Sequence, residues 1–184
     1  MTKVEIKSRW TGAVIYSCDV PDDVPSGIAL RHALEKAAVS RTNLIGTNLR
    51  GADLRGADLI GANLRDANLS EQKNDFWNIL IHAPAEIQGL RLALTEGRVD
   101  GSTYEGPCAC LVGTIANVRH ANYQEIGIKP DSTRPAERWF MGIKEGDTPE
   151  TNQISRITVE WLDKFVMLLD AARVNPYSHD ATTK

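Results

Sequence analysis

Leucine recurs at every fifth position through one segment of the chain, from Leu44 to Leu69. The residue two places before each leucine is small, alanine in four of the six cases and threonine in the other two. A period of five fits neither the α-helix, with about 3.6 residues per turn, nor the β-strand, with a repeat of about 2. If each five-residue unit forms one side of a coil, every leucine points to the axis and glycines turn the corners. We therefore predict a solenoid over residues 42–71.

Hydrophobic and polar residues alternate with a period of two in the two short runs that flank Thr11 and Gly12. This alternation predicts a β-hairpin over residues 1–25. The side chains expected on its apolar face are Val4, Ile6, Val14, Tyr16 and Cys18.

The segment between the hairpin and the repeats has apolar residues at helical spacing. Residues 26–41, "SGIALRHALEKAAVSR", place Ile28, Leu30 and Leu34 on one side of a helix. We interpret this segment as an amphipathic helix with Ser26 as its N-cap, which covers the first coil because terminal repeats need a cap. The alternative is that it forms one more, degenerate coil of the solenoid.

The five-residue pattern ends near Ser70, and the composition changes after it. We predict a compact α/β domain, mostly helical, over residues 75–175 and a tail over residues 176–184. The elements expected in this domain are two helical pieces broken near Pro84, a helix from near Pro107, a strand over residues 137–143 and an amphipathic helix over residues 152–173.

The repeats resemble a known family. The units "ADLRG", "ADLIG", "ANLRD" and "ANLSE" follow the A-[DN]-L-x-x signature of the pentapeptide-repeat family. The resemblance implies a right-handed quadrilateral β-helix with four repeats per coil. The order of hairpin, short repeat run and α/β domain is also loosely similar to small accessory proteins of phages and prophages. The fold class expected for the whole chain is mixed α/β.

Composition narrows the classes of protein further. The formal net charge is -3, so no overall basic field favours nucleic acid as a partner. The chain has three cysteines, an odd number, and no signal peptide is evident, which predicts reduced thiols in the cytoplasm. The longest apolar runs are too short to span a membrane. If a phage encodes the protein, its expected location is the host cytoplasm.

The length of the repeat run bears on its partners. Some pentapeptide-repeat proteins, notably the quinolone-resistance group, resemble a DNA duplex and bind gyrase through a long acidic rod. Here about six repeats make about one and a half coils, which rise only about 7 to 10 Å, so DNA mimicry is disfavoured. The leucines at the far end, Leu64 and Leu69, need a cover. We expect either the C-terminal domain or the same end of a second chain, with a homodimer slightly favoured.

One group of polar and aromatic residues in the C-terminal loops suits an anionic ligand. Arginine offers a planar donor fork for phosphate, and an aromatic ring offers a face on which a base can stack. The alternative is structural, with Arg138 paired to Glu105 or Glu137 and Trp139 in the core. The residues predicted to bind a nucleotide-like ligand are Asp100, Ser102, Tyr104, Arg134, Arg138 and Trp139.

A second candidate site contains thiols. Cys108 and Cys110 lie near the expected start of a helix, where the helix dipole stabilises a thiolate, and His120 follows them. The order of Cys and His resembles that of cysteine hydrolases, although the C-x-C spacing is not the local signature of the papain-like proteases. A zinc site would need a second pair of ligands, so we predict neither a metal nor a cofactor.

These observations favour a non-enzymatic binding protein of phage or prophage type. Its expected role is to inhibit a host defence factor or to sequester a nucleotide-derived signal, with a small nucleotide-like ligand or a host protein as partner. The alternative is a small cysteine-dependent hydrolase that uses Cys108 or Cys110 with His120.

Overall fold

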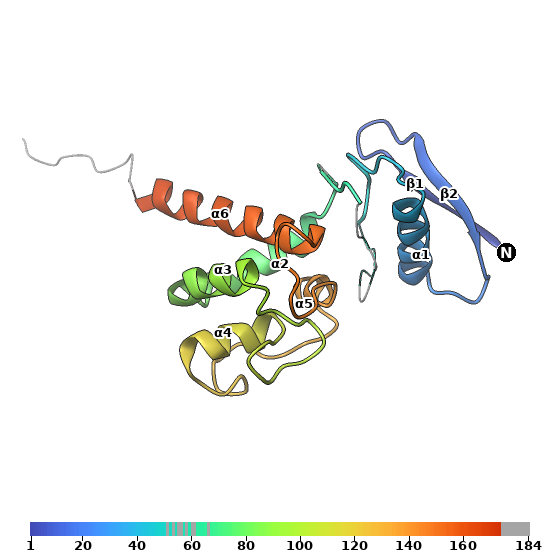
Figure 1. The fold of residues 1–184 in the computed structure, drawn as a ribbon. Coiled ribbons are helices and arrows are strands. Elements are labelled where there is room, and N and C mark those ends of the chain that lie inside the picture. The colour runs from blue at the N-terminus through green and yellow to red at the C-terminus, as the bar shows by residue number, and fades with distance from the viewer. Residues whose placement is uncertain are drawn as a thin grey trace, which may run out of the picture.

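The computed structural model describes residues 1–50, 52, 54, 57, 59, 62–65 and 67–173. The fold is mixed α/β, with a two-stranded hairpin at the N-terminus and helices elsewhere (Figure 1). The elements are β1 (Thr2–Lys7), β2 (Val14–Val20), α1 (Ser26–Val39), α2 (Ser70–Ile81), the 3-10 helix η1 (Pro84–Glu86), α3 (Ile87–Thr95), α4 (Leu111–Arg119), α5 (Pro135–Phe140) and α6 (Gln153–Arg173). We call residues 44–69 the repeat segment and residues 70–173 the helical part.

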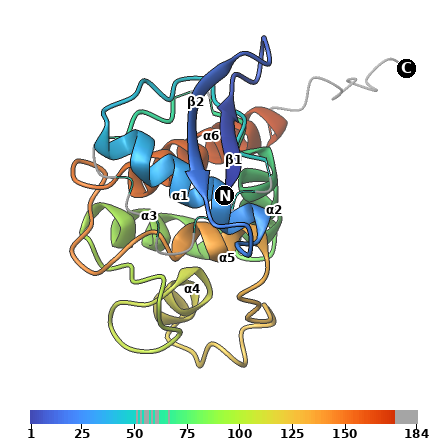
Figure 2. The same cartoon turned by 90° about the vertical axis from the view of Figure 1, so that its right-hand side faces the viewer.

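The predicted hairpin and cap helix are both present. Strands β1 and β2 pair antiparallel, and the hairpin lies against α1 (Figure 2). The register shifts between Ile6 and Lys7, so Ile6 is fully buried whereas Val14 lies outside the predicted apolar face and is exposed. The residue at the N-cap of α1 is Pro25 rather than Ser26, because helical geometry already begins at Ser26. Residues 26–39 are therefore a helix, as predicted, rather than a further coil.

The repeat segment buries its leucines as the period predicts. All six are between 0 and 5% exposed. A backbone turn recurs every five residues: the N–H of Ala52 donates to the carbonyl of Leu49, and the same bond recurs at Ala57, Ala62 and Ala67. The described residues of the segment form isolated β-bridges rather than continuous strands. Asp53, Arg55 and Asp58, which the five-residue period predicts to face water, lie outside the described residues.

The helical part covers the repeat segment within one chain. A cavity of about 30 Å³ separates Ala52 and Leu54 from Trp139, and one of about 90 Å³ separates Ala57 and Leu59 from Gly142 and Ile154. The leucines predicted to need a cover are themselves buried, with Leu64 at 1% and Leu69 at 5% exposure. These two leucines are therefore covered within one chain. A homodimer stays a prediction, but uncovered leucines no longer give a reason for it.

Two elements of the helical part differ from prediction. The segment 137–143 is not a strand, because α5 occupies Pro135–Phe140. Pro135 stands at the first position of this helix, where its missing N–H costs nothing, and the next N–H, from Ala136, donates to the carboxylate of Asp75. The fourth predicted helix begins at Leu111 instead of near Pro107, since residues 98–110 form a loop.

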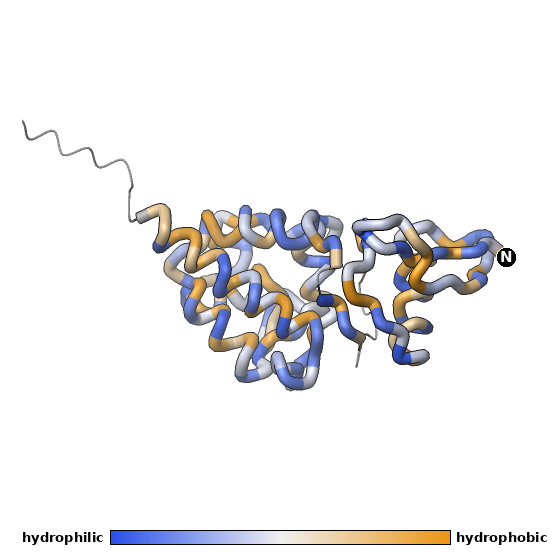
Figure 3. The backbone as a smooth tube through the Cα atoms, turned by 90° about the horizontal axis from the view of Figure 1, so that it is seen from above, coloured by the Kyte–Doolittle hydropathy of each residue, from blue (hydrophilic) through white to orange (hydrophobic). Residues whose placement is uncertain are grey.

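The remaining helices agree with the pattern. The chain breaks between α2 and α3 near Pro84, and Gly97 follows α3 with a positive φ of 70°. Coloured by hydropathy, the helices show alternating hydrophobic and hydrophilic stretches, as amphipathic helices do (Figure 3). Helix α2 begins at Ser70, so the repeats continue directly into the helical part without a linker. None of the helices among the described residues is long and apolar enough to cross a membrane.

Candidate functional site

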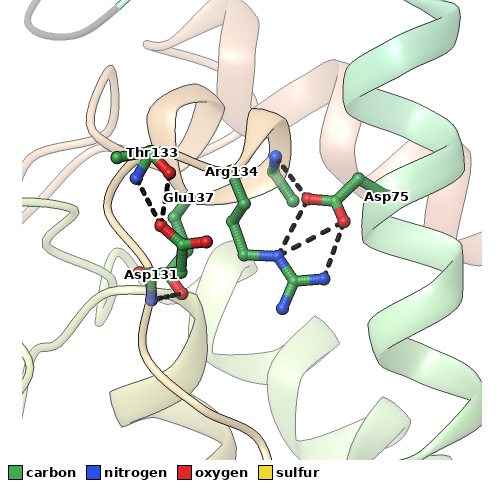
Figure 4. Close-up of polar contacts among 6 residues, drawn as sticks. Asp75, Asp131, Thr133, Arg134 and Glu137 are labelled. Atoms are coloured by element: carbon green, nitrogen blue, oxygen red, sulfur yellow. Dashed lines mark hydrogen bonds and ion pairs between the residues drawn. The ribbon is translucent and has the colours of Figure 1, made fainter.

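Arg134 is held by a carboxylate from another helix. Its Nε and Nη2 donate to Asp75 of α2, the shortest distance being 2.7 Å to Oδ1 (Figure 4). Asp75 also accepts the N–H of Ala136 at 2.9 Å, so one carboxylate joins α2 to the start of α5. The two side chains of the pair are only 20% and 18% exposed. The guanidinium that was predicted to bind a ligand is therefore already engaged by the protein.

Tyr104 is held in a similar way. Its hydroxyl donates to the buried carboxylate of Glu137, which also accepts the N–H of Asp131 at 2.9 Å. Burial and the bond to Glu137 raise the pKa of Tyr104 well above its usual 10.0. Its ring stacks on Tyr123 with centroids 5.5 Å apart. Tyr104 therefore ties the loop after α3 to α5.

Trp139 belongs to the core. It is 1% exposed, its indole N–H donates to Thr158 Oγ1 at 2.8 Å, and its ring packs on Trp161 with centroids 5.0 Å apart. This position matches the structural alternative from the sequence. Arg138 differs from that alternative, because it has no ion pair with any described residue and lines the 30 Å³ cavity beside the repeat segment.

Asp100 and Ser102 bond to each other. The N–H and hydroxyl of Ser102 both donate to Asp100 Oδ1, at 2.9 and 2.6 Å. Five of the six residues thus take part in separate local contacts that hold loops and helices, and Arg138 lines a small cavity. Ligand binding by this group stays a prediction.

The thiols are not arranged like those of a hydrolase. Burial raises the pKa of Cys110 to about 11, although backbone N–H groups at the start of α4 oppose the shift. Burial and a contact with Glu145 raise the pKa of Cys108. His120 is the exposed C-cap of α4, whereas Cys110 is its N-cap, and nine helical residues between them span about 13 Å. No group of three or more His, Cys, Asp or Glu suited to a metal occurs in the described part of the chain.

One cleft that could hold a ligand was not predicted from the sequence. It lies between α6 and the repeat segment and has a volume of about 850 Å³. One wall is formed by α6 and the residues just before it, and the other by residues 62–65, residues 67–69 and Arg9 of the hairpin turn. Volumes of this order are typical of ligand sites. The charged residues that line it are Arg9, Arg65, Lys73, Arg156 and Lys164, with Glu150 and Glu160.

The charge of this cleft is opposite to that of the whole chain. Among the described residues, five basic and two acidic side chains line it, while the net charge of the protein is -3. Arg156 and Lys164 are exposed and form no ion pair with any described residue. The partly exposed Trp161 adds an aromatic surface to the same wall. The cleft can therefore attract an anion and contact a flat ring at the same time.

The wall formed by α6 is well anchored. Asn152 Oδ1 accepts the N–H groups of Ile154 and Ser155 at the start of the helix, at 2.8 and 3.1 Å. The Asn152 amide also donates to Asp147 at 2.8 Å, which ties the helix to the preceding loop. The only sequence signal for this wall was a polar stripe on α6, and nothing in the sequence showed that Arg9 would face it.

Comparison with known proteins identifies one part of the chain. No curated protein and no solved structure matches the chain. The model of the pentapeptide-repeat family matches residues 34–71 with eight copies of the unit. The match begins inside α1, because Leu34 keeps the five-residue spacing although it lies in a helix. Residues 34–71 are thus identified as a run of pentapeptide repeats.

Proposed function

We propose that this protein is a non-enzymatic binding protein whose ligand, an anion bearing phosphate, occupies the cleft between α6 and the repeat segment. The observation that carries the proposal is the excess of basic side chains in a cleft of about 850 Å³ on a protein of net charge -3. A concave site lined by one sign of charge focuses the field and raises the local concentration of counter-ions. Arginine and lysine together are the usual donors to phosphate oxygens.

Two features favour binding over catalysis. Arg156 and Lys164 are exposed and unpaired within the described residues, so they are available to a ligand without breaking internal contacts. The polar side chains on the described parts of the walls are amides, hydroxyls, cations and the carboxylates of Glu150 and Glu160, and no cysteine or histidine is among them. The predicted role as an inhibitor of host defence or a sponge for a nucleotide-derived signal would use such a site, and it remains an expectation.

The repeat segment serves in this proposal as a small right-handed quadrilateral β-helix. The N–H of Asn68 donates to the carbonyl of Thr47 at 2.8 Å, and Asn48 bridges Asn68 in parallel. The bridged residues are four five-residue units apart, as a coil with four sides requires. The same coil brings Arg65 next to Gly46, whose N–H donates to the Arg65 carbonyl at 2.8 Å. The coil thereby holds the second wall of the cleft at a fixed distance from the hairpin.

Binding of simple phosphate ligands tests the proposal. We expect calorimetric titration with inorganic phosphate, AMP and ATP at low ionic strength to detect binding that weakens as salt is added. Arg156→Ala and Lys164→Ala should each raise the Kd of at least one of these ligands by about tenfold, because each removes a charge-assisted hydrogen bond. The matched control is Lys36→Ala, an exposed lysine on α1 that does not line the cleft.

Melting curves must accompany the titrations, so that loss of binding is not mistaken for loss of folding. All three side chains are exposed and none forms an ion pair with a described residue, so the stability of all three variants should stay close to that of the wild type. The proposal is wrong if none of the three ligands binds the wild type, or if Lys36→Ala weakens binding as much as the two cleft variants.

A further inference from the structure

We propose that the ligand of the cleft carries two phosphate groups separated by a nucleoside, as in a linear dinucleotide with a 5′-phosphate. In this arrangement Arg156 binds one phosphate, Lys164 binds the other, and the base between them contacts Trp161. This inference rests on the proposed function and adds to it the spacing of the charges. The wall of α6 carries the argument.

Charges alternate in sign along this wall. Arg156, Glu160 and Lys164 follow one another at intervals of four residues, and all three are exposed and line the cleft. With a rise of about 1.5 Å per residue, Arg156 and Lys164 are about 12 Å apart along the helix axis. Glu160 lies midway between them and pairs with neither in the structure, although the spacing would allow both pairs.

This order of charges disfavours a single compact anion. A phosphate or a chain of adjacent phosphates at the centre of the wall would face the carboxylate of Glu160, and like charges at short distance repel. A ligand with an anion at each end and hydrogen-bond donors in the middle fits the same wall. The hydroxyls of a ribose or the amino group of a base supply such donors. An ionised Glu160 has no hydrogen to donate, so it acts only as an acceptor of these hydrogen bonds.

The aromatic residue lies between the two cations. Trp161 follows Glu160 directly and lines the cleft, with its ring backed by Trp139 and its carbonyl holding the indole N–H of Trp77 at 3.0 Å. A ring fixed by the core loses little freedom when a base stacks on it, and base stacking on aromatic side chains is largely independent of base identity. The wall therefore offers one base contact flanked by two phosphate contacts.

Three adenine ligands separate the possibilities. The compound pApA has two phosphates separated by a nucleoside, ApA lacks the terminal phosphate, and ADP has two adjacent phosphates. We expect the wild type to bind pApA about tenfold more tightly than either of the others, because only pApA engages both cations. One of the two variants, Arg156→Ala or Lys164→Ala, should no longer distinguish pApA from ApA, while the other should still do so.

Glu160→Gln tests the central charge. The substitution keeps the size and acceptor of the side chain but removes its charge, so we expect the affinity for ADP to rise and the preference for pApA over ADP to narrow. Lys36→Ala should retain the wild-type preference. We expect pApA to quench the tryptophan fluorescence of the wild type but not that of Trp161→Leu, which would show that the base contacts Trp161.

The outcomes distinguish this inference from the function on which it rests. If ADP binds as tightly as pApA and both arginine and lysine variants lose the two ligands equally, the cations converge on one anion and the inference fails while the anion site stands. If neither these ligands nor inorganic phosphate binds, the proposed function itself fails.

Discussion

The repeat segment and the helical part are stabilised in different ways. In the repeat segment one hydrogen bond, from alanine N–H to leucine carbonyl, recurs every five residues, and each leucine is buried in the same manner. In the helical part each helix is fixed by contacts that occur once, such as the bond from Trp139 to Thr158 and the pair of Asp75 with Arg134. The repeat segment is thus stabilised by one set of contacts repeated every five residues. The helical part is stabilised by contacts between individual pairs of residues.

The largest effect is expected from a charge placed on the axis of the repeats. Leu54→Asp puts a carboxylate without a partner into a site that is 1% exposed, which costs several kcal/mol, about 3 or more. Because the sites are equivalent, Leu49→Asp should cost about the same, and urea unfolding of the two variants should give similar losses. Arg50→Ala is the control, since Arg50 is exposed and its pair with Glu71 contributes only about 0.5 kcal/mol. A large difference between the two leucine variants would contradict the equivalence of the repeats.

A smaller loss is expected from breaking one specific pair in the helical part. Asp75→Ala leaves Arg134 and the N–H of Ala136 without their acceptor in a site that is mostly buried, and we expect a loss of about 2 to 3 kcal/mol. The matched control is Asp163→Ala, which breaks the pair with Arg91 that joins α6 to α3 in a more exposed setting. That pair should contribute about 1 kcal/mol or less. Equal losses in the two variants would mean that burial does not decide the strength of these pairs.

The smallest effect concerns acid. Arg119 donates to Glu86 at 2.8 Å, and this bond lowers the pKa of Glu86 below its usual 4.5. A carboxyl group with a lowered pKa stabilises the folded state above its unfolded pKa, and that contribution is lost as the pH falls from about 4.5 through the folded value. Glu86→Gln should therefore unfold more easily than the wild type at pH 7, by about 1 kcal/mol, and the difference should shrink below pH 4. If the difference in free energy of unfolding between Glu86→Gln and the wild type were the same at pH 7 and below pH 4, Arg119 would not stabilise the ionised form of Glu86.

The parts of the fold that the sequence predicted well are those where local pattern decides the structure. The leucine period predicted which residues of the repeat segment are buried, and the spacing of Ile157, Leu162 and Phe165 predicted α6. The prediction of a strand over residues 137–143 was wrong. It rested on the bulky apolar residues of this segment, which suit a strand when only local sequence is considered. The helix there depends on a carboxylate supplied by Asp75, which is distant in the sequence.

The candidate site was harder to predict for the same reason. Arginine and tryptophan near one another suggested a binding site, but the sequence cannot show that Arg134 is already paired or that Trp139 packs in the core. The cleft combines Arg9 of the hairpin turn with Arg156 of α6, so it exists only once the chain has folded. A stripe of alternating charges on α6 was visible in advance, yet such stripes also occur on ordinary solvated helices.

In the coil proposed for the repeats, the bridge between Asn48 and Asn68 joins residues one full turn of four units apart. On the proposed coil, an insertion of four units would advance the hairpin by one strand spacing, about 4.8 Å, and leave Arg9 on the same side of the molecule. An insertion of one unit would instead turn the hairpin by about a quarter of a revolution and carry Arg9 away from α6. If the repeats form this coil, their number sets the rotation of one wall of the cleft about the coil relative to the other, as well as the distance between the two walls.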